Sequence, residues 1–252
     1  MTVSKRILGL SDSKSVFVPS WKRPEFFELI KALSQKDNPK ICYIGAARGD
    51  NPERIAEFFE LSNRVSFTPN ALKLFNMVTD DPKAYFADAD VIFIDGGATR
   101  NLIALMREWG ALAPLQHAYE RGTLLVGASA GISMLFDWCV SDSIRTQILP
   151  VRGIGLLAGT VCAHYDASAD RRAVLQTMLH GTKNGLPGYG LEDGVGVLFE
   201  DGKLSSVFTT EDGGKAHVFD TIDGGVTHRM IEGVSTKSGL EVGKSEIEPI
   251  SE

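Results

Sequence analysis

The stretch that most constrains the fold is residues 123–131, where an apolar segment leads into Gly-Ala-Ser-Ala-Gly. The apolar run before Gly127 has strand character, and residues 132–138 are compatible with a helix. Two glycines and two alanines allow a tight connection, because larger side chains would collide with neighbouring strands. The pattern predicts a strand, a sharp turn carrying Ser129, and a helix.

A serine on such a turn has the geometry that a nucleophile requires. The strained turn pushes the hydroxyl out of the sheet, and free N–H groups at the start of the next helix can stabilise an oxyanion. Gly-x-Ser-x-Gly also arises by chance, or from close packing of a helix on a sheet. The choice between these interpretations of Ser129 depends on the rest of the chain.

Strand-like segments alternate with helical ones over much of the chain. We expect helices over 23–35, 100–109, 113–120 and 169–180, and strands over 7–10 (an edge strand or a lead-in), 40–44, 64–67, 91–94 and around Val161. A further helix should begin near Pro52, with Asp50 or Asn51 as its N-cap. This alternation predicts a mainly parallel sheet with helices on both faces, and 252 residues are ordinary for one such domain.

The pattern changes from Gly188 onward. Acidic-Gly turns at 192–194, 200–202 and 211–214 separate apolar runs at hairpin intervals, which predicts an antiparallel extension of the sheet. Residues 231–252 are polar and weakly patterned. We therefore expect a single α/β domain over 1–230 and a loosely ordered tail over 231–252.

Composition excludes several classes of protein. A net charge of −6 without a long basic run argues against a nucleic-acid partner, and no segment has the roughly 20 apolar residues that span a bilayer. Only a short apolar stretch precedes Asp12, so we expect no secretion signal. Cys42, Cys139 and Cys162 are scattered, which suits reduced, structural thiols in the cytoplasm and offers no metal-site spacing.

Two further segments end at predicted strand termini. Gly97 lies in Asp95-Gly96-Gly97-Ala98-Thr99, after the strand 91–94, and His164 follows the strand around Val161. The carboxyl ends of parallel strands lie at one edge of a sheet, where sites form. A lone histidine in this position is more often solvated or packed than catalytic. The histidines at 117, 180, 217 and 228 are interpreted as surface or structural residues.

Taken in order, these segments resemble the aspartyl dipeptidase (peptidase E) and cyanophycinase family of serine peptidases. The resemblance spans about residues 40–200 and rests on 44–50, 95–99, 127–131, 163–165 and 191–194. It implies a three-layer α/β/α sandwich, flavodoxin-like and similar to class I glutamine amidotransferase domains. It also implies that no metal and no organic cofactor is used.

The resemblance implies a role for each matching residue. Ser129 would be the nucleophile and His164 the general base. The backbone N–H groups of Gly97 and Ala130 would form the oxyanion hole. This agrees with the sequence, because Gly97 permits close approach of the backbone to the substrate.

A carboxylate must hold the histidine tautomer, and three aspartates are candidates. The family pattern points first to Asp193 and next to Asp142, which follows the serine helix. Asp166 would give a His-x-acid arrangement, but residues i and i+2 on a strand share a face without an automatic hydrogen bond. The sequence leaves this choice open.

Thr99, Arg171 and Arg172 are candidates for binding the substrate, a small peptide. An arginine could hold an acidic side chain or a terminal carboxylate by bidentate hydrogen bonds. The family loop commonly reads Gly-Gly-Gly-Asn-Thr, and Ala98 replaces its asparagine here. The preference for an N-terminal aspartate (Asp-X) is therefore open, as is a homodimer shaped by the C-terminal segment.

Two other functions compete with this interpretation. An esterase or amidase of the α/β-hydrolase type would place its histidine late in the chain, at His217 or His228. A non-catalytic binding protein could retain the fold without using Ser129 as a nucleophile.

Overall fold

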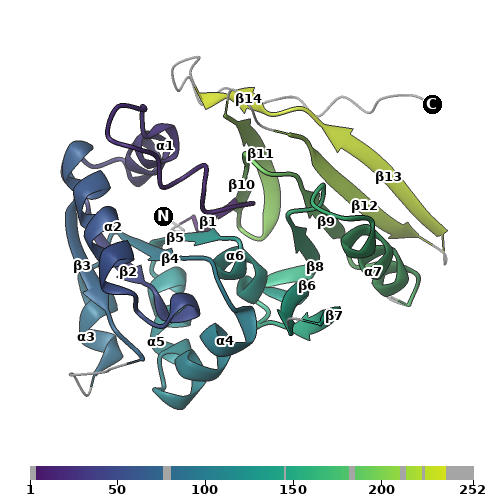
Figure 1. Ribbon diagram of the computed structural model, residues 1–252, viewed down its shortest axis with the longest axis horizontal. Helices are drawn as coiled ribbons and strands as arrows, with labels where there is room; N and C mark the ends of the chain where they lie inside the picture. Colours follow the sequence, from purple (N-terminus) through teal and green to yellow (C-terminus); the bar gives the residue numbers. More distant parts are fainter. Residues whose placement is uncertain are drawn as a thin grey trace.

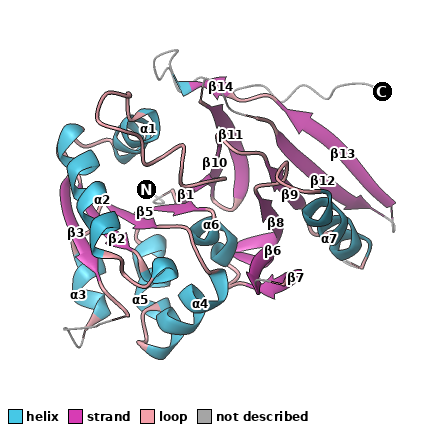
Figure 2. Cartoon of the chain, in the orientation of Figure 1, coloured by secondary structure: helices cyan, strands magenta, loops and turns pink. Residues whose placement is uncertain are grey.

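A computed structural model describes residues 4–75, 81–144, 146–181, 185–210, 214–222 and 225–236. Within these ranges the strands form two hydrogen-bonded sheets, with helices around the first sheet and one helix against the second (Figures 1 and 2). No helix of this part of the chain combines the length and apolarity required to cross a membrane.

The first sheet carries the parallel core of the molecule. Its strands are β1 (Arg6–Leu10), β2 (Lys40–Ile44), β3 (Thr68–Leu72), β4 (Val91–Ile94), β5 (Leu124–Ala128), β10 (Val195–Glu200), β11 (Lys203–Thr209) and β14 (Val234–Ser235). Among the described residues their order is β14-β11-β10-β1-β5-β4-β2-β3. Strands β1 to β5 pair in parallel, and β10 and β11 extend the sheet in antiparallel pairing.

Helices cover both faces of this sheet because its strands are apolar on both sides. The helices are α1 (Glu25–Ser34), α2 (Pro52–Arg64), α3 (Pro82–Ala87), α4 (Thr99–Glu108), α5 (Leu112–Glu120) and α6 (Ala130–Leu135). One core cluster joins α1 and α2 to one face, through Phe27 and Phe58. A second cluster joins α4, α5 and α6 to the other face, through Leu102, Leu115 and Ile132. These layers are the predicted α/β/α arrangement, which is confirmed.

The second sheet lies beside the first. The sequence predicted one sheet with an antiparallel extension rather than two sheets. Its strands are β6 (Phe136–Ile144), β7 (Gln147–Arg152), β8 (Leu157–Ala163), β9 (Gly188–Leu191), β12 (Ala216–Ile222) and β13 (Gly225–Ile231), with α7 (Ala169–His180) packed against it. In the described residues the order is β13-β12-β9-β8-β6-β7. Strands β6, β8 and β9 pair in parallel, and the others are antiparallel.

Several local predictions need correction. Strand β1 is internal rather than an edge, since it pairs with both β5 and β10 and Ile7 and Leu8 are fully buried. The segment 64–67 ends α2 and forms a turn, and the strand begins only at Thr68. The helix after Ser129 stops at Leu135, because the chain enters β6 directly.

Other local predictions are confirmed or lie outside the described residues. Asn51 caps α2 by accepting a hydrogen bond from the N–H of Arg54, with Pro52 at the first position. Helix α7 begins and ends where the spacing predicted. The acidic-Gly turn at 211–213 and the tail from 237 to 252 lie outside the described residues, whereas β14 pairs with β11.

Candidate active site

Ser129 lies in the connection between β5 and α6, in the conformation that the glycine-rich pattern predicts. Its φ and ψ are 51° and −106°, a region that non-glycine residues seldom occupy. A Cβ atom at Gly131 would collide with the carbonyl oxygen of Ile94, and one at Gly127 would lie 2.5 Å from the nitrogen of Ile132. The small residues therefore let this turn pack against β4 while the serine hydroxyl remains accessible.

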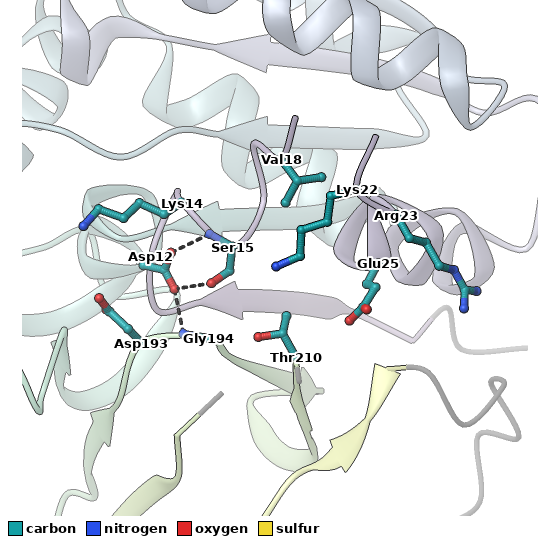
Figure 3. A pocket seen from close by; sticks show the side chains of 10 residues that line it. All are labelled: Asp12, Lys14, Ser15, Val18, Lys22, Arg23, Glu25, Asp193, Gly194 and Thr210. Atoms are coloured by element: carbon teal, nitrogen blue, oxygen red, sulfur yellow. Dashed lines mark hydrogen bonds between the residues drawn. The ribbon is translucent and has the colours of Figure 1, made fainter. Parts of the chain in front are cut away.

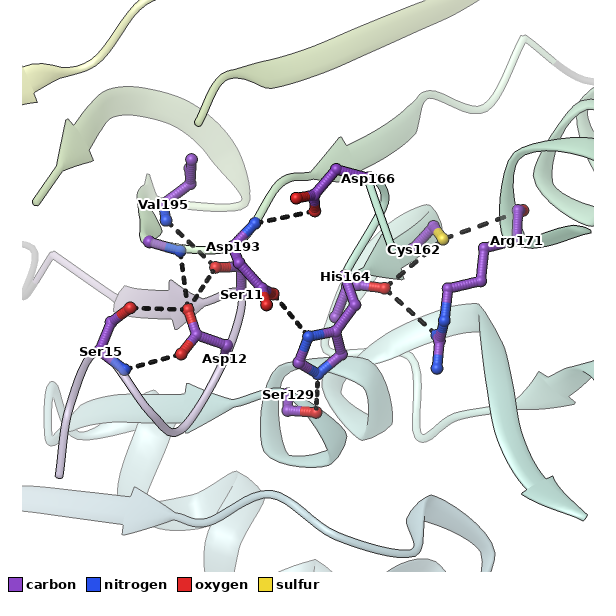
Figure 4. Close-up of polar contacts among 12 residues, drawn as sticks. Ser11, Asp12, Ser15, Ser129, Cys162, His164, Asp166, Arg171, Asp193 and Val195 are labelled. Carbon is purple, nitrogen blue, oxygen red and sulfur yellow. Dashed lines mark hydrogen bonds and ion pairs between the residues drawn. The ribbon is translucent and has the colours of Figure 1, made fainter. Parts of the chain in front are cut away.

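His164 follows β8 of the second sheet and faces Ser129 across the junction between the sheets (Figure 4). Its Nε2 atom lies 2.8 Å from Oγ of Ser129, and its Nδ1 atom lies 2.6 Å from Oδ1 of Asp193. An ionised carboxylate can only accept, so Nδ1 carries the proton. The neutral ring then presents Nε2 as the acceptor for the serine hydroxyl.

Gly97 and Ala130 line a cavity of about 200 Å³ together with Ser129 and His164. Gly97 has φ +138°, and a Cβ atom there would collide with the carbonyl oxygen of Ala47. Within the described residues, neither backbone N–H group donates a hydrogen bond to a protein acceptor. Both donors are thus free to face an oxygen atom of a ligand.

Asp142 lies in the same cavity but does not meet His164. Its Oδ2 atom pairs with Nη2 of Arg171 at 2.5 Å. The Arg171 side chain is 8% exposed and also donates to the carbonyl oxygen of Ala163. Asp142 is thus placed to orient Arg171, and of the three candidate aspartates the structure brings Asp193 to the imidazole.

The remaining predicted residues divide between the cavity and its surroundings. Thr99 is buried, lines the cavity and accepts a hydrogen bond from Ser141. Arg172 instead donates to the carbonyl oxygens of Tyr165 and Asp166, away from the residues that line the cavity. Asp166 accepts a hydrogen bond from the backbone N–H of Asp193.

Arg48 also lines the cavity and was missed by the sequence analysis. It ends the short 3-10 helix η1 (Ala46–Arg48) after β2, and its side chain is 43% exposed. Its Nε atom lies 3.5 Å from Asp95, whose fully buried carboxylate is already held by Tyr43 and Arg54 at 2.8 and 2.9 Å. Apart from this long contact with Asp95, the positive charge of Arg48 is available to a ligand in the cavity. The sequence did not indicate this role, because the loop 45–50 has the pattern of a simple strand–helix connection.

The late histidines have other partners. His217 contacts Glu192 and His228 at 2.8 and 2.9 Å, within the second sheet. The hydroxyl of Ser129 contacts His164 instead, so the α/β-hydrolase arrangement is not the one formed here.

The cysteines lie in the interior of the protein. All three thiols are free and buried, and burial raises the pKa of Cys42, Cys139 and Cys162 to about 12. Among the described residues, no group of three or more His, Cys, Asp or Glu side chains is arranged to hold a metal ion.

A serine hydroxyl, an imidazole and a carboxylate in one hydrogen-bonded row at strand ends of an α/β fold define the serine hydrolase class. The sequence model of peptidase family S51 matches residues 13–207. Since this match covers most of the 252 residues, the chain belongs to peptidase family S51. It is accordingly a serine-type peptidase, as its resemblance predicted.

Known relatives and solved structures agree with this assignment. Uncharacterized peptidase YgaJ of Bacillus subtilis (strain 168) is 32% identical over 171 residues, which are 68% of this chain and 74% of that protein. Peptidase E of Citrobacter koseri is 46% identical over 54 residues, 21% of this chain and 24% of its own length.

The structural matches establish the fold. A crystal structure of a peptidase from an acI-B1 Actinobacterium has a TM-score of 0.66 at 15% identity, covering 92% of this chain and 96% of that chain. A putative peptidase E protein from Listeria monocytogenes EGD-e has a TM-score of 0.59 at 13% identity, covering 80% and 96%.

Proposed function

We propose that the chain hydrolyses short peptides through an acyl-enzyme on Ser129, with His164 as general base and Asp193 as the carboxylate that orients it. The observation that carries this proposal is the 2.8 Å contact between Ser129 Oγ and His164 Nε2, continued by Asp193 at 2.6 Å on the other ring nitrogen. Each atom has the neighbour that proton transfer requires.

In acylation, Oγ of Ser129 attacks the peptide carbonyl carbon while Nε2 of His164 takes the hydroxyl proton. Asp193 stabilises the imidazolium through the Nδ1–H bond and keeps the ring in the required tautomer. The carbonyl oxygen becomes an oxyanion, which the N–H groups of Gly97 and Ala130 stabilise. Collapse of the intermediate breaks the C–N bond, and His164 gives its proton to the departing amine.

In deacylation, water takes the place of the amine. His164 removes a proton from the water molecule while the water oxygen attacks the carbonyl carbon of the ester. The same N–H groups stabilise the second oxyanion. Release of the carboxylic acid returns the proton to Ser129 and restores the free enzyme.

We further propose an acidic N-terminal residue as the preferred substrate feature, as in the aspartyl dipeptidases that the sequence resembles. Arg48 and Arg171 both line the cavity that holds Ser129, and guanidinium groups bind carboxylates strongly. A volume of about 200 Å³ suits one or two residues of a short peptide rather than a folded protein. The exchange of the family's asparagine for Ala98 leaves these charges in place.

A dipeptide library tests both parts of the proposal. Asp-X, Glu-X, Asn-X and Ala-X peptides are incubated with the wild type and with Ser129→Ala, and product amines are measured. We expect hydrolysis by the wild type alone, fastest for Asp-X. Equal turnover of Ala-X and Asp-X would refute the acidic preference, and unchanged turnover by Ser129→Ala would refute the nucleophile.

We also propose that the enzyme acts in the cytoplasm, where its three buried thiols remain reduced. Cell fractionation with an antibody to the chain tests this proposal. Recovery in a secreted or membrane fraction would contradict it.

A further inference from the structure

The hydrogen-bonded row of Ser129, His164 and Asp193 joins the two sheets, so its geometry depends on how the sheets are held together. Ser129 follows β5 of the first sheet and His164 follows β8 of the second. Asp193 lies in the turn between β9 of the second sheet and β10 of the first. Rotation of this turn would move the carboxylate away from the imidazole without disturbing either sheet.

Two carboxylates hold the backbone of this turn from opposite sides (Figure 4). Oδ1 of Asp166 accepts the N–H of Asp193 at 3.0 Å, and Oδ2 of Asp12 accepts the N–H of Gly194 at 2.7 Å. Gly194 has φ +80°, a conformation that a glycine adopts without strain. Consecutive N–H groups are therefore fixed by side chains far apart in the sequence.

Asp12 is itself held rigidly. It is 2% exposed, and its other contacts are the N–H and hydroxyl of Ser15, at 2.7 and 2.9 Å, and the hydroxyl of Ser11 at 3.2 Å. Burial by itself would raise the pKa of Asp12. The hydrogen bonds from Gly194 and Ser15, together with the nearby His164, lower the pKa by more than burial raises it, so the net change is a decrease. The carboxylate thus remains ionised at neutral pH.

The segment that carries Asp12 also reaches the serine turn. The carbonyl oxygen of Leu10 accepts the N–H of Ser129 at 2.9 Å, and Ser11 exchanges hydrogen bonds with Val195 at 2.9 and 3.1 Å. Leu10, Ser11 and Asp12 therefore hold the backbone of Ser129 at one end of the row and that of the two residues after Asp193 at the other. A pocket of about 240 Å³, drawn in Figure 3, is lined by Asp12, Asp193 and Gly194 among other residues.

We infer that Asp12 and Asp166 are positioning residues of the peptidase, which clamp the 193–194 turn so that the Asp193 carboxylate stays aligned with His164. This inference rests on the proposed roles of Ser129, His164 and Asp193. Asp12 carries the larger share, because it is buried and follows β1, which pairs with the strand β5 that leads to Ser129, whereas Asp166 is exposed.

Substitution of each clamp residue tests the inference. Misalignment of a catalytic group by about 1 Å can cost a hundredfold in rate, so we expect Asp12→Ala to lower kcat by about tenfold to a hundredfold with KM nearly unchanged. Asp12→Asn retains an acceptor oxygen and should recover part of the loss. Asp166→Ala should lower kcat by about threefold to tenfold without changing Tm, because its side chain lies at the surface.

A spectroscopic readout separates positioning from a general loss of structure. The proton between His164 Nδ1 and Asp193 should give a low-field NMR resonance in the wild type, which Asp12→Ala and Asp166→Ala should shift or broaden. The matched control is Asp81→Ala, which removes a carboxylate that accepts one backbone N–H at the start of α3; this helix lies at an edge of the molecule away from β9 (Figure 1). It should leave the resonance and kcat unchanged.

The outcomes distinguish this inference from the proposed function. A wild type that hydrolyses no peptide refutes the proposed function, but the resonance still reports on the clamp. The clamp is refuted if Asp166→Ala and a folded Asp12 variant both show the wild-type resonance, unshifted and unbroadened, and both have a kcat within twofold of the wild type. If Asp12→Ala does not fold, Asp12→Asn and Asp166→Ala decide the question.

Discussion

Oγ of Ser129 lies 2.8 Å from Nε2 of His164, although the two residues follow strands of different sheets. Both residues also have positive φ, 51° and 53°. Such conformations cost of order 1–3 kcal/mol in non-glycine residues and persist only where the surroundings enforce them. The contact between Ser129 and His164 therefore depends on packing in both sheets. The first prediction concerns the loss of the serine hydroxyl.

Ser129→Ala should reduce peptide hydrolysis by at least about a thousandfold, because the nucleophile acts as a unit with its base. The same variant should lose labelling by a fluorophosphonate probe. Ser205→Ala removes a hydroxyl on β11 that donates a hydrogen bond to Glu200 of β10; it is the control and should retain both properties. Labelling of Ser129→Ala as strong as that of the wild type would place the reactive group elsewhere.

Gly131→Ala should destabilise the protein by about 3 kcal/mol, since the added Cβ would collide with the carbonyl oxygen of Ile94. The free energy of unfolding, measured by urea titration, tests this value. Gly181→Ala is the control: its φ is −79° and the new Cβ would meet neighbours only at 3.4 Å and beyond. The control should change stability by no more than about 0.5 kcal/mol, and equal losses in both variants would contradict the steric argument.

Arg48→Met should lower kcat/KM for Asp-X peptides by about tenfold or more and change that for Ala-X peptides little. The reason is that Arg48 presents a charge to the cavity that Asp95 holds only at 3.5 Å. Arg172→Met should leave the ratio unaltered, because Arg172 binds backbone carbonyls outside the cavity. If the ratio of kcat/KM for Asp-X to that for Ala-X peptides is unchanged in Arg48→Met, Arg48 does not recognise the acidic side chain. Arg171 would then be the remaining candidate.

Stability should decrease as the pH falls below about 6.5, in part through His228. Partial desolvation of its ring lowers its pKa from the usual 6.5, and the neighbouring His217 lowers it further. The unfolded chain then binds more protons, so this contribution is present above pH 6.5 and is lost as the pH falls through the folded pKa.

His228→Gln tests this contribution through urea unfolding at several pH values between about 5 and 8. The dependence on pH should be flatter than in the wild type. The control is His117→Gln, at an exposed position of α5, which should keep the wild-type dependence. Identical curves for His228→Gln and the wild type would assign the effect to other groups, such as the Glu192–His217 pair that lies beside His228.

Much of the fold follows from local patterns. The alternation of apolar strands and helices predicted the layered α/β/α arrangement, and the spacing over 169–180 predicted α7 residue by residue. The small residues from Gly127 to Gly131 predicted the turn at Ser129, because only such residues fit against β4. These features depend on local hydrophobic periodicity and on the small size of side chains at fixed positions.

Other features depend on the order of strands in the sheets, which periodicity does not encode. A short apolar run such as β1 looks the same at an edge or in the interior, and its place between β5 and β10 became evident only in the structure. The same limit applies to the site: Asp193, Asp142 and Asp166 were all candidates, in that order, and the order rested on the family pattern rather than on geometry. Arg48 lies in a loop that the sequence predicted to be a simple strand–helix connection.

The sequence by itself determined the layered α/β fold and the tight serine turn, since these arise from hydrophobic periodicity and from small side chains at fixed spacing. The family followed from the resemblance of its motif segments to those of known peptidases. Only the tertiary structure decided that Asp193 meets His164 while Asp142 pairs with Arg171, and that Asp12 holds the turn beside Asp193. The physical reason is that a hydrogen bond between strand ends requires separations of about 3 Å, and the packing of the two sheets sets these separations.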